Sequence, residues 1–182
     1  MTRQVVSVSG PPGAGKSTLA RRLAASLGAD FVQYDDFEII TSWPPERVEN
    51  WLDRGSPFDE AIAPGLYEHL LGLDGLVVFE TPFGRACPQI GPMIDASVWL
   101  DCPLDLALAR KLSTLVQSGG GDPHLAAILS GWLGAYEGFT RRALLVQGEK
   151  VRPLADLHLS ATEAPENIVS SVLSFINRHL AP

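Results

Sequence analysis

Residues 10–17 read GPPGAGKS, and this segment restricts the possible folds of the chain more than any other feature. It matches GxxxxGK(S/T), a loop whose glycines let backbone amide groups turn towards an anion. Before it, residues 4–9 form an apolar, β-branched run that predicts a strand buried on both faces. After it, leucines four residues apart predict an amphipathic helix that begins at Lys16 and ends at Gly28. This order of strand, loop and helix predicts a phosphate-binding site.

The side chains of the loop suit this task. Lys16 adds a positive charge that reaches the β- and γ-phosphates of a nucleotide, and Ser17 offers its hydroxyl to magnesium. The positive end of the following helix faces the same anion. ATP and Mg²⁺ are therefore the expected cofactors. The residues expected to bind them are Gly10, Pro11, Pro12, Gly13, Ala14, Gly15, Lys16, Ser17 and Thr18.

Further apolar runs predict the rest of a parallel sheet. Four more strands are expected at residues 31–34, 76–79, 97–100 and 157–159. Helices are expected in pieces over 43–73, from Pro103 towards Val116, over 123–146 and after Pro165. Strands that alternate with helices predict a sheet covered on both faces. Residues 1–182 are interpreted as a single domain.

Composition excludes several classes of protein. The 182 residues carry a net charge of −7 and no basic stripe, so nucleic acid is not an expected partner. The two cysteines and four histidines show no spacing typical of a zinc site. No apolar stretch suits a signal peptide or a membrane span, so we expect a cytoplasmic protein without a membrane partner, either a monomer or a homodimer.

Acidic residues stand at the predicted carboxyl ends of three strands. Ligands bind at that edge of an open α/β sheet. Asp35 and Asp36 follow the second strand, Glu80 the third and Asp101 the fourth. A carboxylate there can hold magnesium or accept a proton from an attacking hydroxyl. We expect these tasks for Asp35 and Glu80, with Glu80 as a metal residue beside the loop serine, and interpret Asp101 as a helix cap.

The order GPPGAGKS, YDDF, VVFETPFGR, DASVWLDCPLDLALAR and VRPLADLHL resembles the small P-loop kinases of the uridine kinase and phosphoribulokinase type. The resemblance runs from Val5 to about Ile176. It implies a three-layer P-loop NTPase fold with strand order 2-3-1-4-5 and a helical lid at about 110–146. It also implies transfer of the γ-phosphate of ATP to a hydroxyl of a small molecule, with a nucleoside or sugar-like acceptor as first guess.

The same resemblance implies roles for individual residues. Asp35 would be the general base, Arg110 would belong to the lid over the phosphates, and residues 159–164 would border the adenine. The residues expected to take part in catalysis are therefore Lys16, Asp35, Glu80 and Arg110. Because Lys111 and Leu112 follow Arg110, the second lid arginine would be Arg141 or Arg142.

The segment from Trp43 to Arg54 stands where the family that the chain resembles builds its acceptor pocket. Residues expected to contact it are Asp36, Trp43, Arg85 and Arg141. Core packing is the other interpretation of Trp43 and its aromatic neighbours. A P-loop ATPase, or a regulatory nucleotide-binding protein without an acceptor, remains the alternative function. The third strand lacks the Asp-Glu ending usual in such ATPases, and no NKxD element for guanine is present.

Overall fold

A computed structural model describes residues 3–37, 40 and 43–180. Within this part of the chain, the strands form one parallel sheet of five, in the order β2-β3-β1-β4-β5. The predicted fold class and strand order are thus confirmed. The strands are β1 Gln4–Ser9, β2 Asp30–Gln33, β3 Leu76–Glu80, β4 Ala96–Asp101 and β5 Leu157–Ser160.

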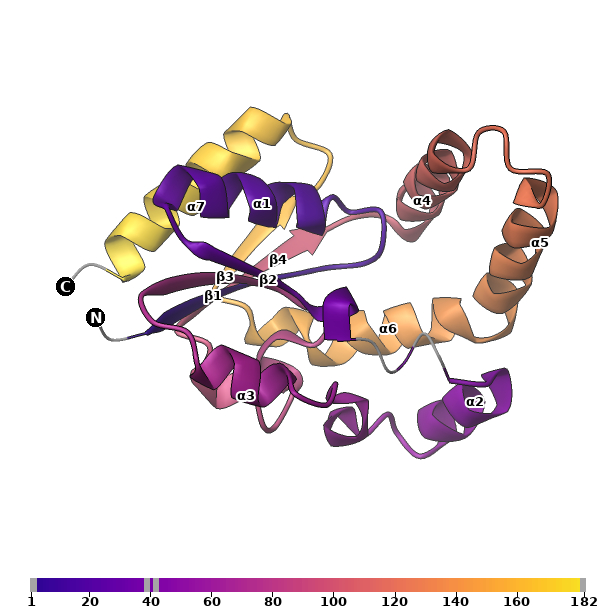
Figure 1. Ribbon diagram of the computed structural model, residues 1–182, viewed down its shortest axis with the longest axis horizontal. Helices are drawn as coiled ribbons and strands as arrows, with labels where there is room; N and C mark the ends of the chain where they lie inside the picture. The colour runs from indigo at the N-terminus through magenta and orange to yellow at the C-terminus, as the bar shows by residue number, and fades with distance from the viewer. Residues whose placement is uncertain (1–2, 38–39, 41–42, 181–182) are drawn as a thin grey trace.

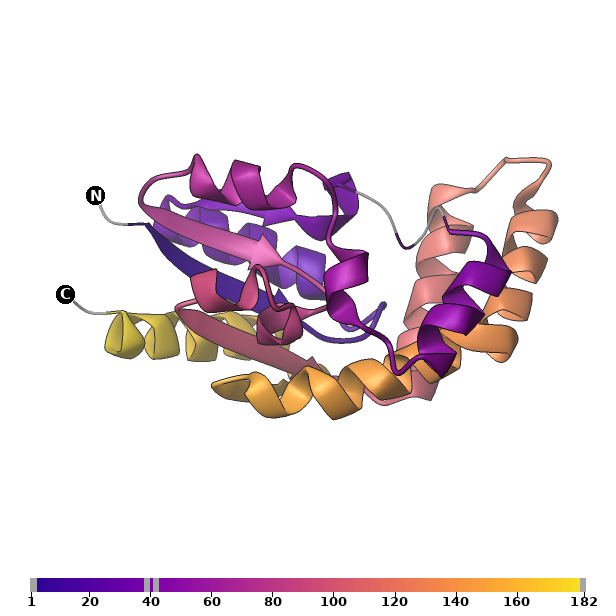
Figure 2. The same ribbon diagram turned by 90° about the horizontal axis from the view of Figure 1, so that it is seen from below.

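Helices cover both faces of the sheet. In Figures 1 and 2, α1 and α7 lie on one face, and α3 and α6 lie on the other. The helices are α1 Lys16–Leu27, α2 Pro45–Asp53, α3 Leu66–Leu71, α4 Leu104–Ser118, α5 Leu125–Ala135, α6 Arg141–Lys150 and α7 Pro165–His179. The predicted start of α1 at Lys16 is confirmed, and Gly28 ends this helix in a left-handed conformation at φ 60°.

The sheet divides the core into two clusters of buried side chains, one on each face. Val6 and Val8 pack with the apolar faces of α1 and α7. Val5, on the other side of the pleat, packs with the cluster beneath α2 and α3. Because each fully buried aliphatic side chain contributes ~1.5–3 kcal/mol, these two clusters fix the sheet under the loop at residues 10–17.

Helices α4 and α5 form an arm on the side of the molecule away from both termini, and α6 leads back from this arm along one face of the sheet (Figure 1). The single helix expected over 123–146 is instead α5, a π-helical turn at Tyr136–Thr140, and α6. Gly134 precedes this turn and Gly138 lies within it, and glycine weakens an α-helix, which permits the change of pitch. The structure describes every residue of helix α5, and none of its side chains is buried.

No helix among residues 3–37, 40 and 43–180 has both the length and the apolarity to cross a membrane.

Candidate active site

The loop between β1 and α1 is held open by glycines in conformations that other residues rarely adopt. Gly10, Gly13 and Gly15 have φ angles of 147°, 87° and 92°. A methyl group on Gly13 would lie 2.1 Å from the carbonyl oxygen of Ala107 in α4, whereas one on Gly15 would meet no atom within 4 Å. The loop is thus pressed against α4 at its middle and is open at its end.

Lys16, Ser17 and Glu80 form one connected group beneath the loop. Lys16 Nζ lies 3.7 Å from Glu80 Oε1, and Ser17 Oγ donates a hydrogen bond of 3.1 Å to Glu80 Oε2. Lys16 Nζ also donates to the carbonyl oxygen of Pro11 at 3.3 Å. Glu80 is the last residue of β3 and pairs in register with Val8 of β1, so the sheet itself places this carboxylate at the loop.

Burial governs the charges in this group. It raises the pKa of Glu80 above its usual range, against the opposing charge of Lys16. It lowers the pKa of Lys16, against the attraction of Glu80 and Asp35. Each partner opposes the neutral form that burial favours in the other, and an anion that enters the loop meets a lysine side chain already desolvated and in place.

Asp35 faces this group from a different element than expected. The second strand ends at Gln33, and Asp35 lies in a 3₁₀ helix, Tyr34–Phe37. Because a 3₁₀ helix turns three residues per revolution, Asp35 and Asp36 do not point to opposite faces as neighbours in a strand do. The charge of Asp35 still acts on both Lys16 and Glu80, and both aspartates are exposed.

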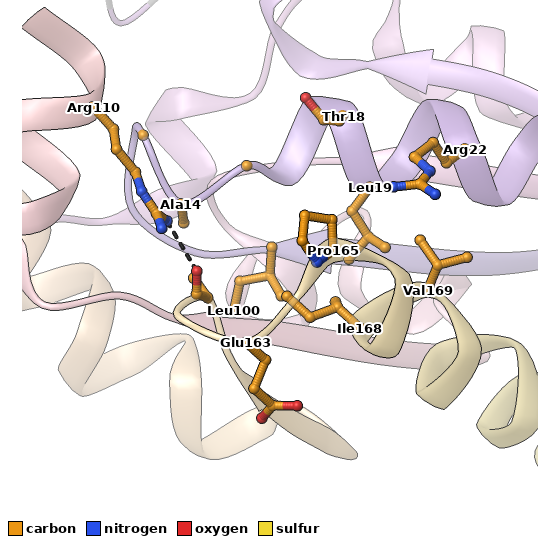
Figure 3. A pocket seen from close by; sticks show the side chains of 13 residues that line it. Ala14, Thr18, Leu19, Arg22, Leu100, Arg110, Glu163, Pro165, Ile168 and Val169 are labelled. Carbon is orange, nitrogen blue, oxygen red and sulfur yellow. Dashed lines mark hydrogen bonds between the residues drawn. The ribbon is translucent and has the colours of Figure 1, made fainter. Parts of the chain in front are cut away.

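A cavity of about 290 Å³ opens on the other side of the loop (Figure 3). The loop residues 13–15 form one wall, and Ala161 and Glu163 after β5, with the start of α7, form the opposite wall. Arg110 reaches over its edge from α4 and donates a hydrogen bond of 2.9 Å to the carbonyl oxygen of Ala161. The structure thus places Arg110 by residues 161–163, expected to border the adenine, and not beside Lys16.

Three residues expected to contact the acceptor have other partners or lie apart. Arg85 turns away from the loop to the amino ends of β4 and β5, where it binds Asp156 at 2.6 Å and the carbonyl oxygen of Asp95 at 2.9 Å. Trp43 is buried in the core, with its ring 6.2 Å from that of Trp51. Arg141 is exposed at the start of α6.

Asp101 does not cap a helix, so that interpretation is wrong. The residue before α4 is Pro103, and no side chain caps this helix. Asp101 instead accepts hydrogen bonds from Arg152 Nε at 2.7 Å and from Trp99 Nε1 at 2.9 Å. The Arg152 bond holds the pKa of Asp101 below its usual range. The carboxylate therefore joins β4 to the segment before β5.

Two residues at the site were not expected from the sequence. Gln147 of α6 is buried and donates to the carbonyl oxygens of Gly10 and Pro82. Lys111 of α4 lies near enough for its charge to lower the pKa of Lys16 further. For Gln147 the sequence held one signal, a single amide after Leu144, Leu145 and Val146.

Comparisons with known proteins agree with this geometry. The model of the ATPase family associated with various cellular activities (AAA) matches residues 6–57. A shikimate kinase of Corynebacterium efficiens is 58% identical over 36 residues, 20% of this chain and 21% of that protein. A cytidylate kinase of Haloquadratum walsbyi is 34% identical over 112 residues, 58% of this chain and 56% of that protein. The chain thus spans from about a fifth to about half of these relatives.

Solved structures extend the likeness over the whole fold. A shikimate kinase from Acinetobacter baumannii, in complex with shikimate, matches with a TM-score of 0.60 and 18% identity, over 100% of this chain and 97% of the other. At that identity the likeness concerns the fold alone. Together with the glycine loop and the strand order 2-3-1-4-5, it leads to one conclusion: the chain has the P-loop NTPase fold, in the form found in small P-loop kinases.

Proposed function

We propose that this chain is a kinase that transfers the γ-phosphate of ATP to a hydroxyl of a small molecule. The observation that carries the proposal is the connected group of Lys16, Ser17 and Glu80, on which the charge of Asp35 also acts. A cation for the phosphates, an oxygen pair for a metal and a carboxylate for a proton then meet at one edge of the sheet. The relatives named shikimate kinase and cytidylate kinase support a small-molecule acceptor.

The nucleotide would lie across the loop. Its phosphates would accept hydrogen bonds from the amides of residues 13–18, and Lys16 would offset charge on the transferring group. Its base would occupy the cavity of about 290 Å³ beside residues 161–163. Arg110 would contact the nucleotide from the edge of that cavity, because its guanidinium already reaches Ala161 there. The lid role of Arg110 over the γ-phosphate stays a prediction.

The residues beside the loop fit magnesium. Ser17 Oγ and the Glu80 carboxylate lie within 3.1 Å of each other, and hydroxyl and carboxylate oxygens are ligands that this ion accepts together with phosphate and water. Ser17 would hold the ion directly and Glu80 would orient its waters. When bound, the ion would supply positive charge between the β- and γ-phosphates.

Asp35 would accept the proton of the acceptor hydroxyl. It is exposed at the edge of the sheet, next to the loop, and forms no ion pair with the residues that the structure describes, and its backbone is fixed by the 3₁₀ helix after β2. A carboxylate in that position turns a weak hydroxyl nucleophile into a better one as the bond to phosphorus forms. Glu80 is less suited to this task, because its two oxygens are bound to Ser17 and paired with Lys16.

The acceptor would enter between Asp35 and α6. Asp36 and Arg141 are exposed on that side and remain candidates for contact with it. Trp43 would act only by shaping the wall, since it is buried. A nucleoside or sugar-like acceptor, and the finer resemblance to the uridine kinase and phosphoribulokinase type, stay predictions. So do a cytoplasmic location, the absence of nucleic acid and membrane partners, and a monomeric or homodimeric state.

One observation favours a second candidate. The AAA model matches residues 6–57, so an ATPase or a regulatory nucleotide-binding protein shares the first part of the site. Such a protein needs no acceptor, and its hydrolysis of ATP would be independent of added metabolites. The end of β3 argues for the kinase, because Glu80 is preceded by Phe79 and the Asp-Glu ending usual in such ATPases is absent, while Asp35 offers a separate carboxylate for the proton of an acceptor hydroxyl.

A screen of metabolite acceptors separates the two candidates. The protein is incubated with MgATP and panels of nucleosides, sugars and hydroxy acids, and release of ADP is compared with a blank that lacks acceptor. A kinase gives ADP release well above the blank for one acceptor class, with a phosphorylated product in equal amount. ADP release that is the same in every panel and in the blank would favour the ATPase.

A further inference from the structure

Gln147 is the only side chain that α6 buries, and it is a polar one. Its exposed fraction is 7%, whereas the other residues of α6, all of them described, are half-buried or exposed. A surface helix is normally held by an apolar stripe. The deepest attachment of α6 to the body of the protein is therefore an amide group.

This amide joins two loops of the active site. Gln147 Nε2 donates a hydrogen bond of 2.7 Å to the carbonyl oxygen of Pro82 and one of 3.3 Å to that of Gly10. Gly10 begins the phosphate loop, and Pro82 lies two residues after Glu80. One side chain thus joins the carboxyl ends of two strands. β1 leads into the phosphate loop that ends at Lys16, and β3 ends at Glu80.

The arrangement has a cost that packing alone does not explain. Gln147 Oε1 is buried and has no hydrogen-bond partner among the described residues. An unpaired buried acceptor lowers stability, so an apolar side chain of similar size would fill the position with less penalty. What an apolar side chain could not do is donate to the two carbonyl oxygens.

The two ends of α6 contact the end of α2 and the turn that follows it, on the side where the acceptor is proposed to enter. Arg142, near the start of α6, forms an ion pair of 2.8 Å with Asp53 at the end of α2. Lys150, the last residue of the helix, donates a hydrogen bond to the carbonyl oxygen of Gly55. Gln147 lies between these two contacts, so α6 links the α2 segment to the phosphate loop.

We propose that Gln147 is a positioning residue that sets the spacing between the phosphate loop and the β3 end, and that makes this spacing depend on the seating of α6. Its expected effect on phosphoryl transfer rests on the kinase function proposed above. Its expected effect on nucleotide binding does not, because the phosphate loop binds ADP whether or not an acceptor exists.

The test compares Gln147→Glu, Gln147→Leu and the control Gln89→Glu, in which the same amide-to-acid change is made at an exposed loop position. The dissociation constant of MgADP is measured from pH 5.5 to pH 8, and each value is divided by that of the control at the same pH. At pH 8 both Gln147 variants should bind MgADP ~10-fold more weakly, the effect of one or two lost hydrogen bonds.

The pH dependence separates positioning from simple loss of packing. A carboxyl group in Gln147→Glu can donate one hydrogen bond when it is protonated, and burial beside two carbonyl oxygens raises its pKa. Binding by this variant should therefore recover several-fold towards pH 5.5, while binding by Gln147→Leu should not. If Gln147→Leu does not fold, Gln147→Glu still carries the test, because its recovery is measured within one protein.

Three results would overturn the proposal: MgADP affinities equal to that of the control, a recovery at low pH shared by Gln147→Leu, or no recovery in Gln147→Glu. The proposed function can fail independently. A wild-type protein that binds MgADP but phosphorylates no acceptor contradicts the kinase assignment and leaves the result for Gln147 interpretable.

Discussion

Replacing Gly13 with alanine should destabilise the protein much more than the same change at Gly15. Both glycines have φ angles near 90°, a region that costs an alanine ~1–2 kcal/mol. Only at Gly13 does the new methyl also meet backbone, 2.1 Å from the carbonyl oxygen of Ala107, where ordinary contact begins at 3.4 Å. The loop and α4 must then separate by more than 1 Å, and overpacking of this kind costs a further ~1–3 kcal/mol.

Urea unfolding of the ligand-free proteins, followed by tryptophan fluorescence, measures this difference. Gly15→Ala should lose ~1–2 kcal/mol and Gly13→Ala ~2–5 kcal/mol of unfolding free energy. In a thermal melt the extra loss should lower Tm by a further ~2–12 °C. The reasoning fails if the two variants are equally stable, because the contact between the phosphate loop and α4 would then not exist in solution.

Two further substitutions and one hydrogen-exchange measurement test other parts of the structure. Lys16→Ala should leave the fold intact and slow phosphoryl transfer by ~10³-fold or more in an ADP-release assay, and near-normal activity would contradict the loop assignment. Arg85→Met should lower the unfolding free energy by ~1–3 kcal/mol at pH 7 without changing nucleotide affinity. Burial would raise the pKa of Asp156, but the Arg85 bond holds it below its usual range, so this stabilisation is present at neutral pH. It should disappear as the pH falls below ~4, and a loss that does not depend on pH would exclude the ion pair. Hydrogen exchange over residues 113–122 should slow when ATP and acceptor are both bound, and equal exchange in both states would argue against a lid there.

The elements around the phosphate loop could be predicted from the sequence because their causes are local. Residues 4–9 and 76–79 are apolar runs long enough for buried strands, and both strands are found at these positions. The GxxxxGK(S/T) pattern places the loop and the start of α1 within a few residues of each other. The strand order 2-3-1-4-5 was implied by the resemblance to small P-loop kinases, and it is the order found.

Contacts between distant residues could not be predicted from the sequence. Arg85 and its partner Asp156 are 71 positions apart, and Asp101 and Arg152 are 51 apart. No local pattern marks such pairs, so the sequence did not indicate that Arg85 binds Asp156, and Asp101 was wrongly interpreted as a cap. Gln147 was missed for the same reason, since its bond to Gly10 spans 137 positions.

The strand boundary near Asp35 was wrong for a different reason. Residues 31–34 have strand propensity, but the chain turns into a 3₁₀ helix at Tyr34, whose buried ring packs against Phe83 of the neighbouring loop. Tertiary packing here outweighs local propensity. The shift changes how Asp35 is presented, yet leaves it beside Lys16.

The most direct test of the proposed kinase is the transfer of labelled γ-phosphate from ATP to the acceptor found in the screen. Asp35→Asn keeps the size of the side chain but cannot take a proton, and Asp36→Asn is its matched control. We expect Asp35→Asn to bind MgATP like the wild type and to transfer phosphate ~10²–10⁴-fold more slowly, while Asp36→Asn keeps its rate at saturating acceptor. Unchanged transfer by Asp35→Asn would contradict the mechanism, and transfer lost only in Asp36→Asn would assign the proton to the neighbouring carboxylate.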